Sequence, residues 1–390
     1  MRSAKKLAVI LAGLLIFGCA MASAEKGAQP GMAVPQKNEK PARWSAEKAK
    51  AWYATQPWLV GSNYIPATAS NELEMWQAET FDLKRIDLEL GWAESIGLNT
   101  MRVFLHDLLC KQDAAGFAKR LDEFLAICAK HHIRPILVLF DSVWDPNPKL
   151  GSQAPPRPGV HNSRWLQSPG AKALEDRSEY PRLEAYVRGV VGKFGHDERV
   201  LAWDVWNEPD NTNGGNYEDP KDKVERVNEL LPKVFAWARE AGAQQPLTSG
   251  VWTDDWTPEK RSATAAIQLE ESDVISFHSY DKPEQFKKRI LSLQPYGRPL
   301  ICTEYMARGN GSTFEGSLPI AKKYNVAAIN WGLVGGKTQT YLPWDSWKKP
   351  YTDREPAQWF HEIFRTDGKP YNEEEVVLIE ELTGRAKVIP

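Results

Sequence analysis

Short apolar runs alternate along this chain with longer segments in which apolar residues recur every three or four positions. Short runs of this kind are typical of buried strands, and the longer spacing is typical of amphipathic helices. From residue 58 onward the pattern predicts eight strands, at 60–64, 100–105, 134–140, 200–206, 246–251, 274–278, 299–303 and 326–331. It also predicts a helix after each strand, at 82–96, 114–131, 180–194, 224–241, 262–270, 283–293, 316–324 and 355–365.

Eight strand-then-helix units indicate an α/β protein with a parallel sheet. Units of this number, in a chain segment of roughly 250 residues or more, suit a closed (β/α)8 TIM barrel. The alternative is an open doubly wound sheet, which usually has a glycine-rich turn after its first strand. Gly61-Ser62-Asn63-Tyr64 does not provide that turn. The sequence therefore predicts a single barrel domain over residues 44–390.

The first 24 residues have the features of a secretory signal peptide. A basic start precedes a short apolar stretch at 7–18, and Ala22-Ser23-Ala24 offers small residues for cleavage before Glu25. Residues 25–43 are rich in Lys, Gln, Gly and Pro, which predicts a flexible tether. We therefore expect an exported protein, periplasmic or extracellular, and no membrane span. Cys19 leaves a lipoprotein form open as the alternative.

Composition narrows the class of partner. The 390 residues carry a formal net charge of −2, so nothing favours nucleic acid as a partner. The 16 tryptophans could pack in the core or could provide flat apolar platforms for sugar rings.

Three cysteines remain after the predicted signal peptide, Cys110, Cys128 and Cys302, and an odd number argues against a full disulfide framework. A pair between Cys110 and Cys128 stays open, and we expect a monomer.

Polar and aromatic side chains gather where the predicted strands end. In a barrel of this type the chemistry lies at the carboxyl ends of the strands. The residues expected there are Asn63, Arg102, His106, Asp141, Trp144, Asn207, Glu208, Trp252, His278, Tyr280, Glu304 and Trp331.

The chain lacks the sequence motifs of several kinds of catalytic site. The chain has no Cys-x-x-Cys, no His-Glu-x-x-His and no Gly-x-Ser-x-Gly, so neither a zinc site nor a serine nucleophile is expected. We expect no metal and no cofactor. Glu208 and Glu304, by contrast, follow two apolar runs. A pair of carboxylates is what acid-assisted cleavage of a sugar acetal requires.

The order of these motifs resembles the clan of retaining glycoside hydrolases that includes the family 5 endoglucanases and mannanases. Asn207-Glu208 on the fourth strand and Glu304 on the seventh match the pair of catalytic positions. Further matches are Arg102 on strand two, His278 and Tyr280 on strand six, and Trp331 on strand eight. The resemblance covers residues 58–365.

The resemblance implies a role for each matched position. Glu208 would be the acid/base and Glu304 the nucleophile, held by Arg102. Asn207 would bind the sugar 2-hydroxyl, and Trp331 would form the floor of the sugar site. The substrate would be an oligo- or polysaccharide of the β-glucan, β-mannan or xylan type. Alternatives that stay open are an inactive carbohydrate-binding barrel, transglycosylation and sugar elimination.

One position departs from the family pattern. Family 5 enzymes usually carry a histidine at the end of strand three, where this chain has Asp141 after Phe140. His106 follows strand two instead, so either residue is a candidate to replace the missing contact. The sugar, its linkage and the choice between endo and exo action depend on loop residues, and the sequence leaves them open.

Overall fold

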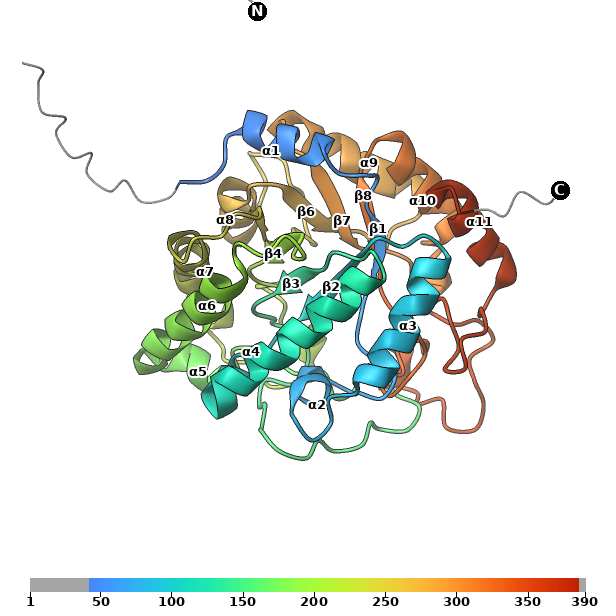
Figure 1. The fold of residues 1–390 in the computed structure, drawn as a ribbon, viewed down its shortest axis with the longest axis horizontal. Coiled ribbons are helices and arrows are strands. Elements are labelled where there is room, and N and C mark those ends of the chain that lie inside the picture. Colours follow the sequence, from blue (N-terminus) through green and yellow to red (C-terminus); the bar gives the residue numbers. More distant parts are fainter. Residues whose placement is uncertain (1–41, 386–390) are drawn as a thin grey trace, which may run out of the picture. The chain divides into compact units, whose positions relative to one another are not determined.

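The structure is a computed structural model that describes residues 42–385, in which eight parallel strands are surrounded by helices (Figure 1). The strands are β1 (Val60–Asn63), β2 (Thr100–Phe104), β3 (Ile136–Val138), β4 (Ala202–Asp204), β5 (Leu247–Thr248), β6 (Ile275–His278), β7 (Leu300–Glu304) and β8 (Ala327–Asn330). The helices are α1 (Ala46–Ala54), α2 (Glu72–Trp76), α3 (Leu83–Ser95), α4 (Asp107–Lys130), α5 (Ala171–Glu175), α6 (Tyr180–Phe194), α7 (Lys223–Glu240), α8 (Ala263–Glu271), α9 (Pro283–Leu293), α10 (Phe314–Lys323) and α11 (Glu373–Thr383).

The eight strands form a closed sheet. Their order is β5-β4-β3-β2-β1-β8-β7-β6, with every neighbouring pair parallel. The two outer strands meet through a parallel bridge between Val251 and Phe277, where the His278 N–H donates to the Val251 carbonyl at 2.9 Å. This closure leaves no free sheet edge. It confirms the predicted (β/α)8 TIM barrel.

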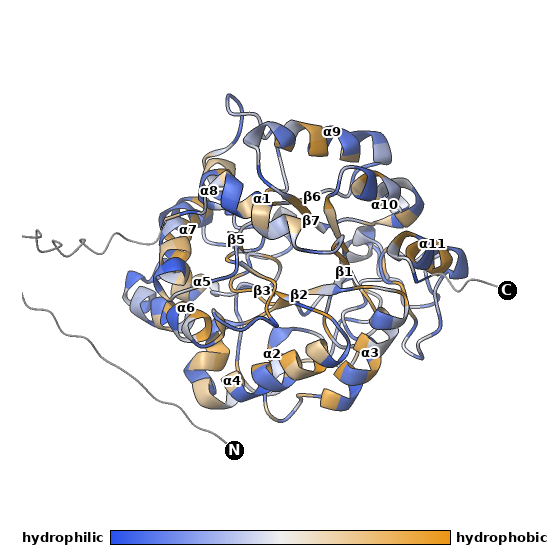
Figure 2. Cartoon of the chain, turned by 45° about the horizontal axis from the view of Figure 1, so that its top comes forward, coloured by the Kyte–Doolittle hydropathy of each residue, from blue (hydrophilic) through white to orange (hydrophobic). Residues whose placement is uncertain are grey.

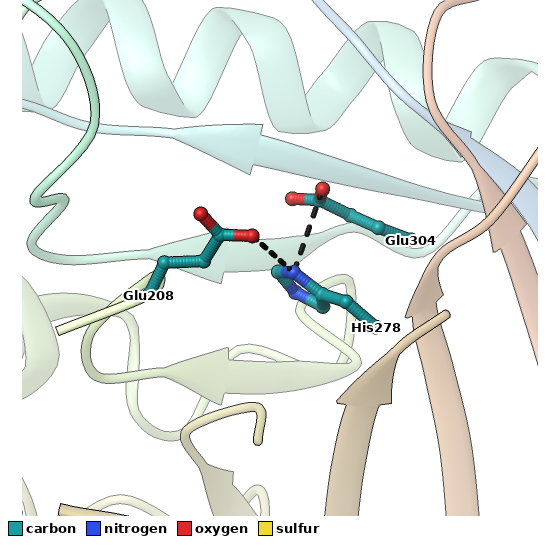
Figure 3. Close-up of side chains that lie close together, drawn as sticks. All are labelled: Glu208, His278 and Glu304. Atoms are coloured by element: carbon teal, nitrogen blue, oxygen red, sulfur yellow. Dashed lines mark hydrogen bonds and ion pairs between the residues drawn. The ribbon is translucent and has the colours of Figure 1, made fainter. Parts of the chain in front are cut away.

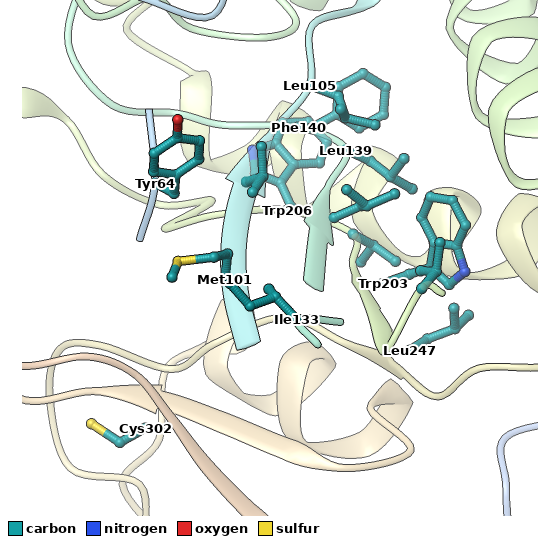
Figure 4. Close-up of a cluster of buried hydrophobic side chains, with 14 of the residues drawn as sticks. Tyr64, Met101, Leu105, Ile133, Leu139, Phe140, Trp203, Trp206, Leu247 and Cys302 are labelled. Atoms are coloured by element: carbon teal, nitrogen blue, oxygen red, sulfur yellow. The ribbon is translucent and has the colours of Figure 1, made fainter. Parts of the chain in front are cut away.

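Alternate residues of each strand face opposite sides of the sheet. In β3, Leu137 belongs to the large apolar cluster beneath the helices, as does Leu139 just after the strand, whereas Ile136 packs inside the barrel. Figure 4 shows part of the outer layer, including Leu139 and Trp203. In Figure 2 the strands are largely hydrophobic and the outer helices carry hydrophilic surfaces. The same alternation turns every second residue of β2 and β4 inward.

Helix α1, which the apolar pattern did not predict, closes the amino-terminal end of the barrel. The Ser45 side chain caps it by accepting the Lys48 N–H. Ala49 and Tyr53 pack against Ile136 and other inward residues at the start of the strands. The Tyr53 hydroxyl donates to the Asn325 carbonyl at 3.0 Å. The opposite, carboxyl end is therefore left for the site.

The helix predicted at 355–365 is wrong, and the last helix is α11. Trp359, Phe360, Ile363 and Phe364 have helical spacing, but all four are buried in an irregular segment. Phe364 forms bridges to Val334 and Pro370, so the backbone there is extended. Both sides of this segment are buried. Its apolar residues therefore happen to have the spacing expected of a helix.

Other differences concern boundaries and loops. The helix predicted at 114–131 begins at Asp107 and is kinked at Asp113. The strands are shorter than their apolar runs, because the runs continue into buried connections. Cys110, Cys128 and Cys302 are free thiols. Within residues 42–385, no helix has the length and hydropathy needed to span a membrane. The predicted signal peptide and nearly all of the predicted tether lie outside the described residues.

The inner apolar layer should contribute strongly to stability. Replacing Ile136, which is fully buried, with alanine should lower the free energy of unfolding by about 2–5 kcal/mol through lost burial and a residual cavity. Leu88 is 48% exposed, and its replacement with alanine should change that free energy by less than about 0.5 kcal/mol. Urea unfolding of both variants measures the difference. Equal losses would contradict the placement of Ile136 inside the barrel.

Candidate active site

A cavity of about 340 Å³ opens at the carboxyl ends of the strands. Seven of the twelve predicted site residues line it directly: Trp144, Asn207, Glu208, Trp252, Tyr280, Glu304 and Trp331. Three more lie behind these seven and contact them, namely Arg102, Asp141 and His278, and Asn63 accepts a hydrogen bond from Arg102. The structure thus brings together eleven of the twelve.

The Arg102 guanidinium occupies the centre of the barrel beneath this cavity. Its Nε and Nη2 donate to Asp204 Oδ2 at 3.0 and 2.8 Å. Nη1 donates to Asn63 Oδ1 at 2.9 Å and to Glu304 Oε1 at 3.0 Å. Nη2 also donates to Asn207 Oδ1 at 2.7 Å. A guanidinium has five N–H donors, so these five hydrogen bonds satisfy it completely.

Asp204 was not predicted from the sequence as a site residue. It lies inside the apolar run of strand β4, yet its side chain is fully buried in the barrel, paired with Arg102. A buried cation is costly unless it is paired and hydrogen-bonded. Asp204 and Glu304 supply that pairing from β4 and β7. A charged residue in the middle of an apolar strand is the sequence signal that could have identified it.

Glu304, the last residue of β7, accepts hydrogen bonds on both oxygens. Arg102 donates to Oε1, and the Tyr280 hydroxyl donates to Oε2 at 2.7 Å. Burial raises the pKa of Glu304, as does the neighbouring Glu208. The Arg102 charge and the Tyr280 hydroxyl act in the opposite direction. The carboxylate form is therefore held by two donors and one full positive charge.

Glu208 has a different environment. The His278 Nδ1 atom lies 2.8 Å from Oε1, and Asn211 Nδ2 donates to Oε2 at 2.6 Å (Figure 3). Burial raises the pKa of Glu208 to about 7. Its backbone has a φ of 40°, in the left-handed region that non-glycine residues rarely adopt. The Asn207-Glu208-Pro209 turn thus aims a carboxyl group of raised pKa into the cavity.

The two carboxyl groups face each other across His278. One oxygen of Glu208, one oxygen of Glu304 and one ring nitrogen of His278 lie within 4.8 Å of one another. Burial lowers the pKa of His278 to about 4, so its ring is neutral. Three such ligand atoms resemble a metal site. Glu304, however, already receives hydrogen bonds from Arg102 and Tyr280, and a guanidinium beside the group repels a cation. The arrangement suits proton transfer better.

Asp141, at the position that departs from the family pattern, orients Asn207. Its Oδ1 accepts from Asn207 Nδ2 at 2.9 Å, and its Oδ2 accepts from Trp165 Nε1 at 2.6 Å. Since Arg102 holds the other end of the same amide, the rotation of Asn207 is fixed. The Asn207 nitrogen is thereby turned to Asp141 and its oxygen to Arg102. Asp141 itself does not line the cavity.

His106 does not take part in the site, so this prediction is wrong. Its ring is fully buried, with Nδ1 accepting the Leu108 N–H and lying 3.3 Å from Asp107 Oδ1. It caps the start of α4. Strand β2 ends at Phe104, two residues earlier, so the chain has already turned toward the helix at His106.

Aromatic residues of the loops divide between two roles. Trp144 and Trp252 line the cavity, together with Trp344, whereas Trp165 and Trp256 are buried in packing. The cavity also contains His161 and His361, which the sequence did not single out. They come from the long connections after β3 and β8. Only the folding of these connections over the barrel brings them to the cavity.

Comparison with known proteins identifies the family. Residues 94–350 match the cellulase family, glycosyl hydrolase family 5. The chain belongs to this family. It is therefore an O-glycosyl hydrolase acting on β-glycosides. No curated protein sequence matches it significantly.

Solved structures of family 5 proteins share this fold at low sequence identity. A GH5_18 variant from Streptomyces cattleya in complex with Manβ1-4GlcNAc is 13% identical, with 85% of this chain and 81% of that chain covered and a TM-score of 0.59. The exo-β-1,4-mannosidase Op5Man5 from Opitutaceae bacterium strain TAV5 is 16% identical, with 84% of this chain and 59% of that chain covered and a TM-score of 0.57. The endo-β-1,4-mannanase from Thermotoga petrophila is 13% identical, with 84% of this chain and 76% of that chain covered and a TM-score of 0.53.

Removing Asp204 should destabilise the family 5 barrel. Asp204→Ala leaves a fully buried guanidinium with two unpaired N–H groups, and the free energy of unfolding should fall by about 3–5 kcal/mol. The half-exposed pair Arg177–Glu229 on the surface is the control, and Glu229→Ala should have a much smaller effect. Chemical unfolding of both variants measures this. Similar losses in the two would show that Asp204 does not hold Arg102.

Proposed function

We propose that this chain is an exported retaining β-glycosidase that works by double displacement. Glu208 is the acid/base and Glu304 is the nucleophile. The observation that carries the proposal is that one oxygen of Glu208 and one oxygen of Glu304 lie within 4.8 Å of each other. Retaining glycosidases hold their carboxyl groups about 5–5.5 Å apart, whereas inverting enzymes leave space for a water molecule at larger separations.

The different surroundings of the two acids assign their roles. A pKa of about 7 keeps a large part of Glu208 protonated near neutral pH, as a proton donor requires. Glu304 receives hydrogen bonds from Arg102 and Tyr280, both of which favour its charged form. An ionised carboxylate is the form that attacks an anomeric carbon.

The reaction then proceeds in two displacements. A Glu304 oxygen forms a bond to the anomeric carbon while the bond to the leaving oxygen breaks, and Glu208 transfers its proton to that oxygen. In the second step, the Glu208 carboxylate removes a proton from water. The water oxygen bonds to the anomeric carbon, and the bond to Glu304 breaks. Both acids return to their initial states, and the product keeps the β configuration.

The rest of the cavity holds the sugar during this reaction. Asn207 is locked by Arg102 and Asp141, so its position for a 2-hydroxyl group is set before the substrate binds. Trp331 presents an apolar ring face held by Phe104 and Trp165. Several similar structures are of β-1,4-mannosidases or mannanases, so β-mannosides are the first substrates to test, followed by β-glucosides and β-xylosides.

The proposal includes export through residues 1–24, followed by a soluble monomer. Basic residues, an apolar stretch and Ala22-Ser23-Ala24 at the start of the chain support it. Sequencing the amino terminus of the secreted protein tests the cleavage before Glu25. A lipid on Cys19 would show anchoring instead.

Replacing the two acids separately should give distinguishable defects. Glu304→Ala should reduce hydrolysis of an aryl β-glycoside to background, and azide should restore turnover by forming the α-glycosyl azide. Glu208→Ala should lose about 10²–10⁴-fold on substrates with poor leaving groups, and much less where the leaving group needs no proton. With azide it should form the β-glycosyl azide, because the covalent intermediate still forms.

Rates and NMR of the azide products measure these outcomes. Glu270, an exposed acid on α8, provides the control, and Glu270→Ala should keep full activity. Unchanged hydrolysis in Glu304→Ala would disprove the mechanism. A β-glycosyl azide from Glu304→Ala and an α-glycosyl azide from Glu208→Ala would show that Glu208 is the nucleophile and Glu304 the acid/base.

The pH dependence of kcat/KM should follow the proton on Glu208. Because the pKa is raised to about 7, the acid form is present below that pH and is lost above it, so activity should fall as the pH rises through about 7. The Asn211 amide stabilises the charged form, so Asn211→Ala should move this alkaline limb to higher pH. Asn216→Ala, which also lines the cavity, should leave the limb in place. A limb that does not move in Asn211→Ala would contradict the assignment.

A further inference from the structure

Two long connections of the barrel are joined to each other beside the cavity. One follows β3 and includes residues 141–178, and the other follows β8 and spans residues 331–372, up to the start of α11. The Asn162 N–H donates to the Thr338 carbonyl at 2.7 Å, and the His161 N–H donates to Ser346 Oγ at 2.9 Å. Such backbone and side-chain hydrogen bonds fix the two connections as one wall.

Further contacts extend this wall. The Tyr351 N–H donates to the Gly159 carbonyl at 2.9 Å, and the Gly159 N–H donates to Gln339 Oε1 at 3.0 Å. The rings of Trp144 and Trp347 stack, with centroids 4.8 Å apart and an interplanar angle of 20°. Large stacked rings at the centre of a loop contact leave little freedom for the loops to separate.

On the cavity side, the wall is a continuous row of rings. Tyr280 after β6 lies 5.2 Å from Trp344 and 5.6 Å from His361, measured between ring centroids. His361 lies 5.5 Å from His161, which lies 6.4 Å from Trp144. All five side chains line the cavity. The row therefore runs from the β6 end, past the connections after β8 and β3.

The wall reaches the connection after β4 as well. There the Trp144 N–H donates to Asn213 Oδ1 at 2.6 Å. The remaining sector of the rim lies between β4 and β6 and contributes Trp252, whose Nε1 donates to Asp210. Glu208, at the end of β4, borders this sector. Since Glu208 gives its proton to the leaving oxygen, the leaving group departs on this side.

We propose that the wall closes the site beyond the first sugar, so that the enzyme is exo-acting and His161 and His361 bind the hydroxyl groups of the non-reducing terminal sugar. This inference rests on the proposed roles of Glu208 and Glu304. With the anomeric carbon between the two acids, the far end of the sugar ring points to the wall. A chain that continued past that end would collide with it.

The two histidines have the chemistry for this contact. His161 Nδ1 lies 2.7 Å from the Leu342 carbonyl, and His361 Nδ1 lies 2.6 Å from the Met306 carbonyl. A carbonyl only accepts, so each Nδ1 carries the hydrogen and each Nε2 is an acceptor. Burial lowers the pKa of His161 to about 4 and also lowers that of His361, so both rings are neutral. Within residues 42–385, neither Nε2 has a hydrogen-bond partner in the structure.

Two neutral acceptors beside an apolar ring face match a sugar that ends in free hydroxyl groups. Each terminal hydroxyl can donate to an Nε2 atom, and a hydroxyl replaced by a further glycosidic bond has no hydrogen to donate. The wall therefore selects against internal residues twice, by steric exclusion and by leaving an acceptor unpaired.

Product analysis tests the mode of action. Mannohexaose, cellohexaose and xylohexaose, each β-1,4-linked and labelled at the reducing end, are incubated with the enzyme alongside the matching aryl monoglycosides. The expected result is release of single sugars, with the label appearing first on the pentasaccharide. Early labelled di- or trisaccharides, with active aryl monoglycosides, would overturn exo action but keep the proposed function. No hydrolysis of any of these substrates would overturn the proposed function itself.

Variants test the two histidines. Aryl glycosides lacking the 4- or the 6-hydroxyl should be poorer substrates of the native enzyme, by about tenfold in kcat/KM for each hydrogen bond lost. In His161→Phe or His361→Phe, this discrimination should disappear for one of the two hydroxyls, which a purely structural role would not produce. His132, 79% exposed on the surface, gives the control His132→Phe with native discrimination. Full discrimination in both variants, or its absence in the native enzyme, would overturn the assignment.

Discussion

The buried guanidinium of Arg102 is the interaction on which the site depends. It sits in the barrel interior, where an unpaired charge would be prohibitively costly. The five hydrogen bonds that it donates satisfy it, and they reach four residues in or just after three strands, β1, β4 and β7. Because the partners include Asn207 and Glu304, the need to satisfy one buried cation also fixes two groups that line the cavity. Stability and preorganisation have the same physical origin here.

Around this cation the protein separates two identical acids by their environments. Glu304 accepts hydrogen bonds from the Arg102 guanidinium and the Tyr280 hydroxyl. The partners of Glu208 are neutral: the Asn211 amide and the His278 imidazole. Burial raises the pKa of both acids, so the difference between their environments comes from their hydrogen-bonding partners. The backbone of Glu208 has a positive φ, and hydrogen bonds from Asn207 to Phe140 and from Ser142 to Pro209 hold the turn on either side of it.

The loops add a boundary to a site that the strands have already built. Asp141 illustrates how the two levels meet: it orients Asn207 on the barrel side and anchors Trp165 of the connection after β3 on the other. That connection then joins the one after β8 to form the wall beside the cavity. A family 5 barrel can therefore keep its chemistry while its loops set how much of a polysaccharide enters.

The amino-acid sequence was enough to place the eight strands and the helices after the first seven of them, and to place Glu208 and Glu304 at or just after strand ends, because apolar periodicity and strand-end polarity are local properties. It missed Asp204, which looks like an interruption of an apolar strand, and read 355–365 as a helix because burial on two sides imitates helical spacing. It also placed His106 in the site, although His106 is the N-cap residue of α4. Which residues meet at the cavity, His161 and His361 above all, was decided only by tertiary structure, since contacts between distant loops leave no periodic trace in the chain.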